Sequence, residues 1–193
     1  MSRSAATGPA RRELFDREAL PHLDHLYTVA MHLAHNRNDA EDLVQETMLR
    51  ALRFFEQFTP GTNCRAWLLT ILYNVFRNRY RQSANAERVT ATEEEFEDRV
   101  EQMGLRADAP ANDPQTAVLD RLMESEVQAA LDSLPEDFRI VLLMVDIQEL
   151  RYEEAAAVLD IPLGTVRSRI SRARGMLKKA LEGFARARGY IRS

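Results

Sequence analysis

Hydrophobic residues recur at intervals of three and four along most of the chain, and this spacing places them on one face of a helix. Between Glu13 and Arg81 no stretch alternates with the period of two that a half-buried strand requires. We therefore predict an all-α protein. The first helical region covers residues 14–35 and breaks at Pro21, because proline lacks the backbone donor that a helix interior needs.

Two further helices complete the first predicted domain. One covers residues 39–57, and either Asn36 or Asn38 is placed to cap it. The other follows a Pro-Gly turn, and either Thr62 or Asn63 is placed to cap it. Three packed helices are therefore expected in this domain.

The apolar pattern stops for about thirty residues and then returns with a second set of helices. Four are predicted: one from Asp113 to Ser133, one with an apolar stripe from Phe138 to Val145, a short one over residues 152–159, and a long last helix after a turn at residues 160–164. The predicted order is a flexible amino terminus (1–12), a helical domain (13–83), an acidic linker (84–112), a second helical domain (113–185) and a tail (186–193).

The composition fits a soluble chain of 193 residues, with 45% hydrophobic and 29% charged residues. A single cysteine excludes an internal disulfide framework and is too few for a zinc ribbon. The amino terminus lacks the apolar core of a signal peptide, and no apolar run is long enough to span a membrane. We expect a cytoplasmic protein without membrane insertion.

Charge is strongly segregated along the chain, although the net charge is only −4. Residues 57–86 contain four arginines and no acid, and residues 161–193 contain nine Lys or Arg and one acid. Residues 87–113 between them contain nine acids and three arginines. An acidic protein can therefore still present two basic surfaces to nucleic acid.

The short helix, the turn and the long basic helix together predict a helix-turn-helix. In the last helix one face carries apolar residues that must pack inward, so the opposite face is exposed; they are Val166, Ile170, Ala173, Leu177 and Leu181. Hydroxyls and guanidinium groups at the start of a helix suit base edges and phosphates in a major groove. A merely solvated face is the alternative, but such a face usually mixes both signs of charge. The candidate DNA-contacting residues are Thr165, Arg167, Ser168, Arg169, Ser171, Arg172, Arg174 and Lys178.

The third helix of the first domain combines basic and amide side chains with aromatic rings and has no carboxylate. Such a surface suits single-stranded nucleic acid, because each ring can stack on an exposed base. An ordinary aromatic core is the alternative. The polar residues are Thr70, Asn74, Arg77, Asn78 and Arg81, and the aromatic ones are Trp67, Tyr73, Phe76 and Tyr80.

The second helix exposes an acidic face that contains Glu41, Asp42, Gln45 and Glu46. Asp42 and Glu46 are like charges four residues apart, and a basic protein partner would relieve their repulsion. A solvated acidic face is the alternative.

Catalytic and metal-binding functions lack support in the sequence. His22, His25, His32 and His35 share the first helical region, but no pair has the i, i+4 spacing that holds one metal from one helix. No phosphate-binding glycine loop, nucleophile elbow or HExxH motif occurs. We expect no enzyme activity, no metal and no cofactor.

Three strings resemble the extracytoplasmic-function (ECF, group IV) sigma factors of bacterial RNA polymerase. They are NRNDAEDLVQETMLRAL, FTPGTNCRAWLLTILYNVFRNRYR and LDSLPEDFRIVLLMVDIQELRYEEAAAVLDIPLGTVRSRISRARGMLKKAL. The resemblance implies that the first domain is sigma region 2 and that the second is sigma region 4. It implies core polymerase and promoter DNA as partners, an anti-sigma factor as regulator, and a possible stress response as the setting.

The resemblance also assigns roles to residues. Asp42, Gln45 and Glu46 would dock on the coiled coil of the largest polymerase subunit, and the last helix would read the −35 element. The −10 element would be bound and opened by Asn63, Arg65, Trp67, Asn74, Arg77, Asn78 and Arg81. The GTNCRAW stretch is similar to a subgroup paired with zinc-containing, redox-sensitive anti-sigma proteins, although Cys64 itself is expected to be a small packing residue.

Two other functions compete with a sigma factor. One is a helix-turn-helix regulator that binds duplex DNA as a dimer and never melts it. The other is a helical metalloenzyme that uses the histidines. The acidic face and the aromatic, basic helix favour the sigma factor over the first, and the missing motifs argue against the second.

Overall fold

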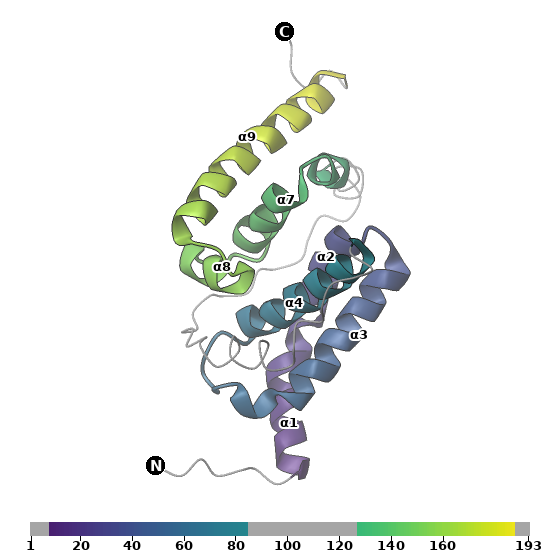
Figure 1. Cartoon of the computed structure of the whole chain (residues 1–193), viewed down its shortest axis with the longest axis vertical. Coiled ribbons are helices and arrows are strands. Elements are labelled where there is room, and N and C mark those ends of the chain that lie inside the picture. Colours follow the sequence, from purple (N-terminus) through teal and green to yellow (C-terminus); the bar gives the residue numbers. More distant parts are fainter. Residues whose placement is uncertain (1–7, 85–126, 188–193) are drawn as a thin grey trace. The chain divides into compact units, whose positions relative to one another are not determined.

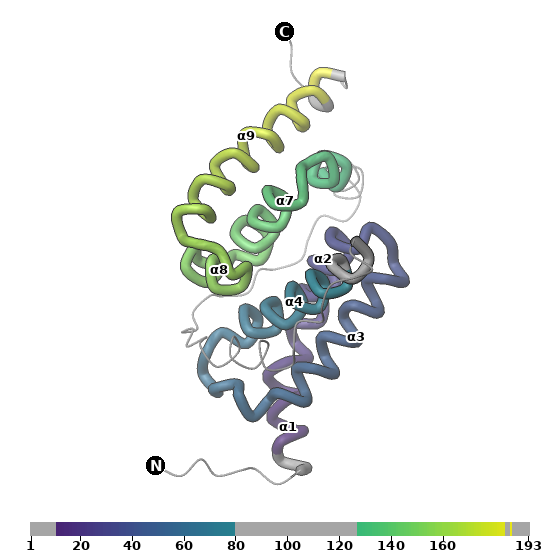
Figure 2. Tube along the Cα trace, viewed as in Figure 1, coloured from purple at the N-terminus to yellow at the C-terminus, as the bar shows by residue number. Residues whose placement is uncertain are grey.

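The computed structural model describes residues 8–84 and 127–187, and every regular element in these two ranges is helical (Figures 1 and 2). The prediction of an all-α fold is therefore confirmed for this part of the chain. The chain divides into two compact units, Met1–Asp108 and Ala109–Ser193. The acidic linker predicted over residues 84–112 lies, apart from Ala84, outside the described residues, and so does the predicted helix start at Asp113.

The described part of the first unit contains four α-helices where the sequence predicted three. They are α1 (Gly8–Ala19), α2 (Leu23–Ala34), α3 (Arg37–Arg53) and α4 (Cys64–Ala84), with short 3₁₀ turns η1 (Leu20–His22) and η2 (Phe55–Gln57). The extra helix arises at Pro21, where the predicted break separates α1 from α2. Helix α3 packs between α2 and α4, and both α1 and α2 also contact α4 (Figure 1).

Asparagine side chains start both α3 and α4. The Asn36 side chain accepts a hydrogen bond from the Asp39 amide at 2.9 Å, so Asn36 rather than Asn38 is the cap of α3. The Asn63 side chain accepts from the Ala66 amide at 3.1 Å, whereas the Thr62 hydroxyl donates to the Thr59 carbonyl. Asn63 therefore caps α4, and both alternatives left by the sequence are resolved.

An arginine of α1 secures the end of α3. Arg11 donates to the carbonyl oxygens of Leu52 and Arg53 at 3.0 and 3.1 Å and to the Glu56 carboxylate at 2.8 Å. These carbonyls belong to the last turn of α3, where no intrahelical donor remains. Residues 8–12, which we expected to be flexible, are therefore helical, and α3 ends at Arg53 rather than continuing to Gln57.

The second unit is built around its last helix. Residues 127–132 are helical and are followed by α7 (Glu136–Leu142), a π-helical turn η3 (Leu143–Ile147), α8 (Tyr152–Leu159) and α9 (Leu163–Ala187). Both α7 and α8 pack against α9 (Figure 2). Val166, Ile170 and Ala173 are buried, which confirms the first part of the inward stripe of the last helix, whereas Leu177 and Leu181 are only half-buried. Two residues of the predicted tail, at 186–187, are helical.

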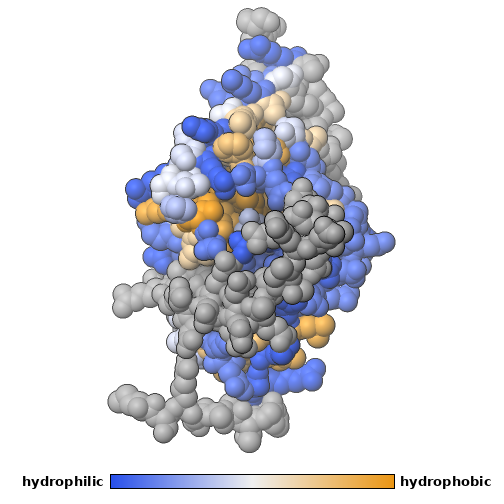
Figure 3. All heavy atoms as spheres, viewed as in Figure 1, coloured by the Kyte–Doolittle hydropathy of each residue, from blue (hydrophilic) through white to orange (hydrophobic). Residues whose placement is uncertain are grey.

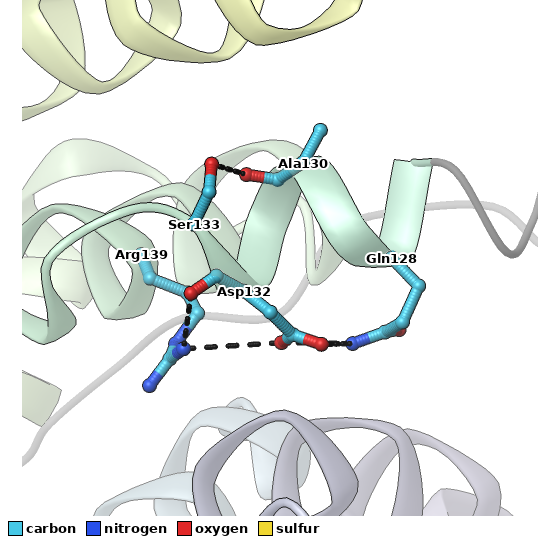
Figure 4. A network of polar contacts seen from close by, with 5 residues as sticks. All are labelled: Gln128, Ala130, Asp132, Ser133 and Arg139. Carbon is cyan, nitrogen blue, oxygen red and sulfur yellow. Dashed lines mark hydrogen bonds and ion pairs between the residues drawn. The ribbon is translucent and has the colours of Figure 1, made fainter. Parts of the chain in front are cut away.

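A buried arginine fastens residues 127–132 to α7 (Figure 4). Arg139 donates to the Asp132 carbonyl oxygen at 3.4 Å, and its guanidinium lies 3.8 Å from the Asp132 carboxylate. Gln128 donates to both oxygens of that carboxylate at 3.0 Å. Because only 5% of Arg139 is exposed, the aspartate compensates a charge removed from water.

Hydrophilic residues dominate the visible face of the described surface, and hydrophobic residues show between them in limited areas (Figure 3). In residues 8–84 and 127–187 no helix combines the length and the apolar character that a membrane crossing requires.

Candidate nucleic-acid interface

Helices α8 and α9 form the predicted helix-turn-helix. At the start of α8 the Arg151 amide donates to the Glu154 carboxylate at 2.8 Å. Helix α8 ends at Leu159, and the C-cap residue Asp160 turns the chain with its left-handed backbone (φ 55°). The Pro162 carbonyl oxygen then accepts from the amides of Thr165 and Val166, which closes the first turn of α9. Capping and turn geometry thus place the start of α9 directly after α8.

The outward face of α9 presents free arginines. Arg167, Ser168, Ser171 and Arg172 are exposed. Within the described ranges neither Arg167 nor Arg172 forms a hydrogen bond or ion pair, so both guanidinium groups are available to a ligand. The Ser168 hydroxyl donates to the Thr165 carbonyl oxygen at 3.0 Å, Thr165 is half-buried, and Lys178 lies 3.7 Å from Glu182.

Two other predicted DNA-contacting residues, Arg169 and Arg174, are paired with carboxylates of the same unit. Arg169 forms an ion pair with Asp137 of α7 at 2.8 Å. Arg174 donates from Nε and Nη2 to the two carboxylate oxygens of Asp146 in η3, at 3.0 and 2.6 Å. The hydrogen bond with Asp146 is the main cause that raises the pKa of Arg174 above its ordinary value. We predicted a DNA-contacting role for both arginines because their acidic partners lie on other elements and leave no local pattern in the sequence.

Trp67, which we predicted to take part in binding and opening the −10 element, is buried. Only 3% of Trp67 is exposed, and its ring centroid lies 5.2 Å from that of Phe58 and 6.2 Å from that of Phe55. Phe55 also contacts Phe15 of α1 at 5.2 Å, edge to face. Trp67 is therefore part of an aromatic core cluster, and its ring is not available for stacking on a base. The cluster holds the loop between η2 and α4 against the domain.

The other residues predicted at the −10 site differ in their exposure to solvent. Asn63, Arg65, Arg77 and Asn78 are half-exposed, whereas Asn74 is buried with 6% exposure. Thr70 is also buried, and its hydroxyl donates to the Ala66 carbonyl oxygen at 3.0 Å. Arg81 lies on α4, but its side chain is outside the described residues, as is that of Tyr80.

Sequence reasoning missed Arg79, which is exposed on α4. Its spacing continues the series Leu68, Leu72 and Val75, and that series is buried. Periodicity therefore placed Arg79 on the core side, while its place in the basic segment was the signal that favoured exposure.

Arginines neutralise part of the acidic face of α3, and an exposed leucine lies beside the acidic residues. Asp42 and Gln45 are exposed, whereas Glu46 is half-exposed and accepts from Arg50 at 2.6 Å. Leu49, four residues after Gln45, is 65% exposed. We missed Leu49 in the sequence, although its spacing of seven from Asp42 places it on the same face. An exposed leucine beside carboxylates is suited to a partner with an apolar patch and basic residues.

The histidines and the cysteine give no sign of a metal or reactive site. No group of three or more His, Cys, Asp or Glu among the described residues is arranged to hold a metal ion. Cys64 is buried, and burial with the nearby charge of Glu18 raises the pKa of its thiol to about 12. The thiol therefore stays protonated at neutral pH, as a packing residue would.

His22 gives a prediction about acid stability. Burial lowers the pKa of His22 below 6.5, and repulsion from His25 and Arg65 lowers it further. The unfolded chain takes up this proton near the ordinary value, so stability falls as the pH drops through 6.5 toward the folded pKa. We expect His22→Gln to lose less stability than the wild type in urea unfolding between about pH 7 and pH 5. Equal losses in both proteins would contradict this assignment.

Two protein-family models match this chain. The model described as Sigma-70 region 2 matches residues 20–86, and the model described as Sigma-70, region 4 matches residues 124–177. The first match covers the whole of α2, α3 and α4, and the second covers α7, α8 and α9 as far as Leu177.

The chain is also similar to named proteins. It is 40% identical over 179 residues to the ECF RNA polymerase sigma factor SigE of Mycolicibacterium smegmatis. This alignment covers 91% of this chain but only 65% of the length of SigE. It is 41% identical over 157 residues to the ECF sigma factor EcfG of Rhodopseudomonas palustris, covering 81% of this chain and 78% of EcfG.

Solved structures agree with these relatives. One is the sigma factor RpoE of Bartonella quintana, solved with the anti-sigma factor NepR; its superposition on this chain has a TM-score of 0.61 at 30% sequence identity. The superposition covers 88% of this chain and 98% of the RpoE chain. CnrH, solved with the cytosolic domain of CnrY, has a TM-score of 0.58 and 26% identity, covering 90% and 88%.

Proposed function

This chain belongs to the ECF family of RNA polymerase sigma factors, and from that premise we propose that it binds core polymerase and directs it to specific promoters. The family is one of transcription regulators, in agreement with the expectation of no enzyme activity. The observation that carries the proposal is the free, hydroxyl- and arginine-bearing outward face of α9, presented directly after α8. In this proposal α9 reads the −35 element.

The first unit would engage the −10 element. Four half-exposed polar residues and the exposed Arg79 supply the groups for phosphates and unpaired bases. Asn63 caps α4 and so fixes the loop that precedes it, while the aromatic cluster holds the same loop from beneath. Trp67 would act in opening only through this support. The residues proposed to contact the −10 element are Asn63, Arg65, Arg77, Asn78 and Arg79.

The exposed face of α3 would dock on core polymerase. Asp42 and Gln45 supply polar contacts, and Leu49 supplies an apolar anchor between them and the end of the helix. Buried apolar anchors commonly carry much of the binding free energy of an interface, and the charged rim adds orientation. Glu46, already paired with Arg50, would contribute less than Asp42.

Leu49→Ala tests the docking face. Because the side chain is 65% exposed, we expect the free energy of unfolding to change by less than about 0.5 kcal/mol. Affinity for core polymerase should fall about tenfold, measured by competition with the wild type for a limiting amount of polymerase. Leu20→Ala is the matched control, since Leu20 is 45% exposed but lies in η1. Equal losses in both variants would contradict a specific docking role for Leu49.

Run-off transcription tests the whole proposal. Purified chain and core polymerase are mixed with a library of promoter fragments, and the fragments that yield defined transcripts are sequenced. We expect selected fragments to share two conserved elements at fixed spacing. A chain that binds duplex DNA tightly alone and never redirects the polymerase would instead be a self-sufficient regulator, and the sigma proposal would fail.

Regulation by an anti-sigma factor belongs to the proposal as well. RpoE was solved with the anti-sigma factor NepR, and CnrH was solved with the cytosolic domain of CnrY. By analogy this chain would act in the cytoplasm with polymerase until an anti-sigma protein sequesters it, in a setting such as a stress response.

A further inference from the structure

Arg169 and Arg174 lie on opposite flanks of the buried stripe of α9. They are five residues apart, which corresponds to about 140° around the helix and about 7.5 Å along it. Between the two flanks lie the buried residues Val166, Ile170 and Ala173, which pack on the rest of the unit. Each arginine therefore reaches from one edge of the packed face toward the elements beneath.

The acidic partners of these arginines lie at the two ends of one continuous helical segment, which consists of α7 and η3 and is called a rod below. Asp137 stands in the first turn of α7, and Asp146 stands in η3, which continues α7. One ion pair thus ties each end of this rod to one flank of α9. Tyr152 at the start of α8 is a smaller cause that also raises the pKa of Arg174.

The buried stripe already limits rotation of α9 about its axis, because side chains interdigitate across a packed helix face. Two polar ties on opposite flanks resist rotation in both directions. Arg169 and Arg174 are 27% and 52% exposed in their side chains, and ion pairs at such exposed positions contribute little to folding stability. What the pairs supply is therefore orientation.

We propose that the Asp137–Arg169 and Asp146–Arg174 pairs fix the rotation of α9, so that Arg169 and Arg174 position the reading face rather than contact DNA. The proposal rests on the proposed function, because it assumes that α9 reads duplex DNA. At the start of α9 the residues that contact bases are then the outward Arg167, Ser168, Ser171 and Arg172, and the exposed lysines farther along, Lys178 and Lys179, meet backbone phosphate. In the opposite view, phosphates would draw both arginines away from the aspartates.

A charge swap separates the two views. The full chain carries Asp146→Arg, Arg174→Asp or both, in holoenzyme with core polymerase. The probe is the duplex promoter fragment that the wild-type holoenzyme selects most strongly from the library. Each single variant should form promoter complexes about tenfold less well, and the double variant should recover most of that loss, because it restores the pair with reversed polarity. A double variant as weak as Arg174→Asp alone overturns the proposal.

Asp146→Asn gives an independent sign. It is the mildest change at this position and keeps the size of the side chain. If Asp146 positions Arg174, the variant weakens promoter binding. If Asp146 merely competes with DNA for Arg174, the variant strengthens binding, and the proposal is wrong. Melting curves of the free chain confirm that the second unit remains folded in each variant.

Salt dependence provides a readout that a loss of fold would not imitate. Each phosphate contact steepens the dependence of log K on log salt concentration by about one unit. Arg174→Ala should leave this slope unchanged, while Lys179→Ala, at an exposed position farther along α9, should reduce it by about one. An Arg174→Ala slope that falls as far as that of Lys179→Ala contradicts a positioning role.

The two proposals fail in different ways. If the wild-type chain yields no promoter-specific transcript with core polymerase, the sigma function itself is wrong. If the wild type is active and the charge swap does not restore binding, only the assignment of the two ion pairs is wrong.

Discussion

Trp67→Ala is expected to lower the free energy of unfolding of the first unit by about 3–5 kcal/mol, the range for deleting a large buried aromatic side chain. Trp67 is 3% exposed and lies between Phe55 and Phe58, so the change leaves a cavity where the loop meets α4. The melting temperature of this unit should fall by at least about 10 °C. Differential scanning calorimetry and near-ultraviolet circular dichroism measure the two effects.

Tyr73→Ala is the control for Trp67→Ala. Tyr73 is an aromatic residue of the same helix but is only half-buried, so its replacement by alanine should lower the melting temperature much less than Trp67→Ala does. A Trp67→Ala protein that melts close to the wild type but no longer opens promoters would contradict the core assignment. That result would return Trp67 to the DNA-contacting role that the sequence suggested.

The helices could be predicted from sequence because their apolar spacing is strong and local. The break at Pro21 follows from a missing donor, and each cap could be narrowed to two residues, because short polar side chains precede both apolar runs; the structure selects Asn36 and Asn63. The helical start at Gly8 could not be predicted in this way. It depends on Arg11 reaching the last carbonyls of α3, more than forty residues away, and no local pattern reports such a contact.

The sequence predicts which helices form the candidate site, but it does not predict which of their side chains are free to contact DNA. Charge segregation identified α4 and α9, and helical geometry identified the outward face of α9. Spacing alone does not tell whether an arginine on a flank points to solvent or to a carboxylate of another helix, as Arg174 does to Asp146. Nor does it tell a stacking aromatic from a core aromatic, since Trp67 and a surface tryptophan would carry the same sequence signal.

Arg172→Ala is expected to relax the choice of base at one position of the upstream element by about 1–3 kcal/mol, which corresponds to roughly 5- to 150-fold. Arg172 is exposed on the outward face of α9 and has no partner among the described residues, so its fork is free to hold a base edge. Alanine is also the better helix former, and the free energy of unfolding should stay within about 0.5 kcal/mol of the wild type.

The measurement for Arg172→Ala is a comparison of promoter variants that differ by single base pairs, transcribed by wild-type and variant holoenzyme. Arg186→Ala is the matched control, because it removes the same charge from an exposed position 14 residues farther along α9. Reading by Arg172 requires that preference disappear at one base pair and persist at the others, while Arg186→Ala keeps every preference. If Arg172→Ala instead weakens all sequences equally and flattens the salt dependence, Arg172 holds a phosphate, and the base reading falls to Arg167 with Ser168 and Ser171.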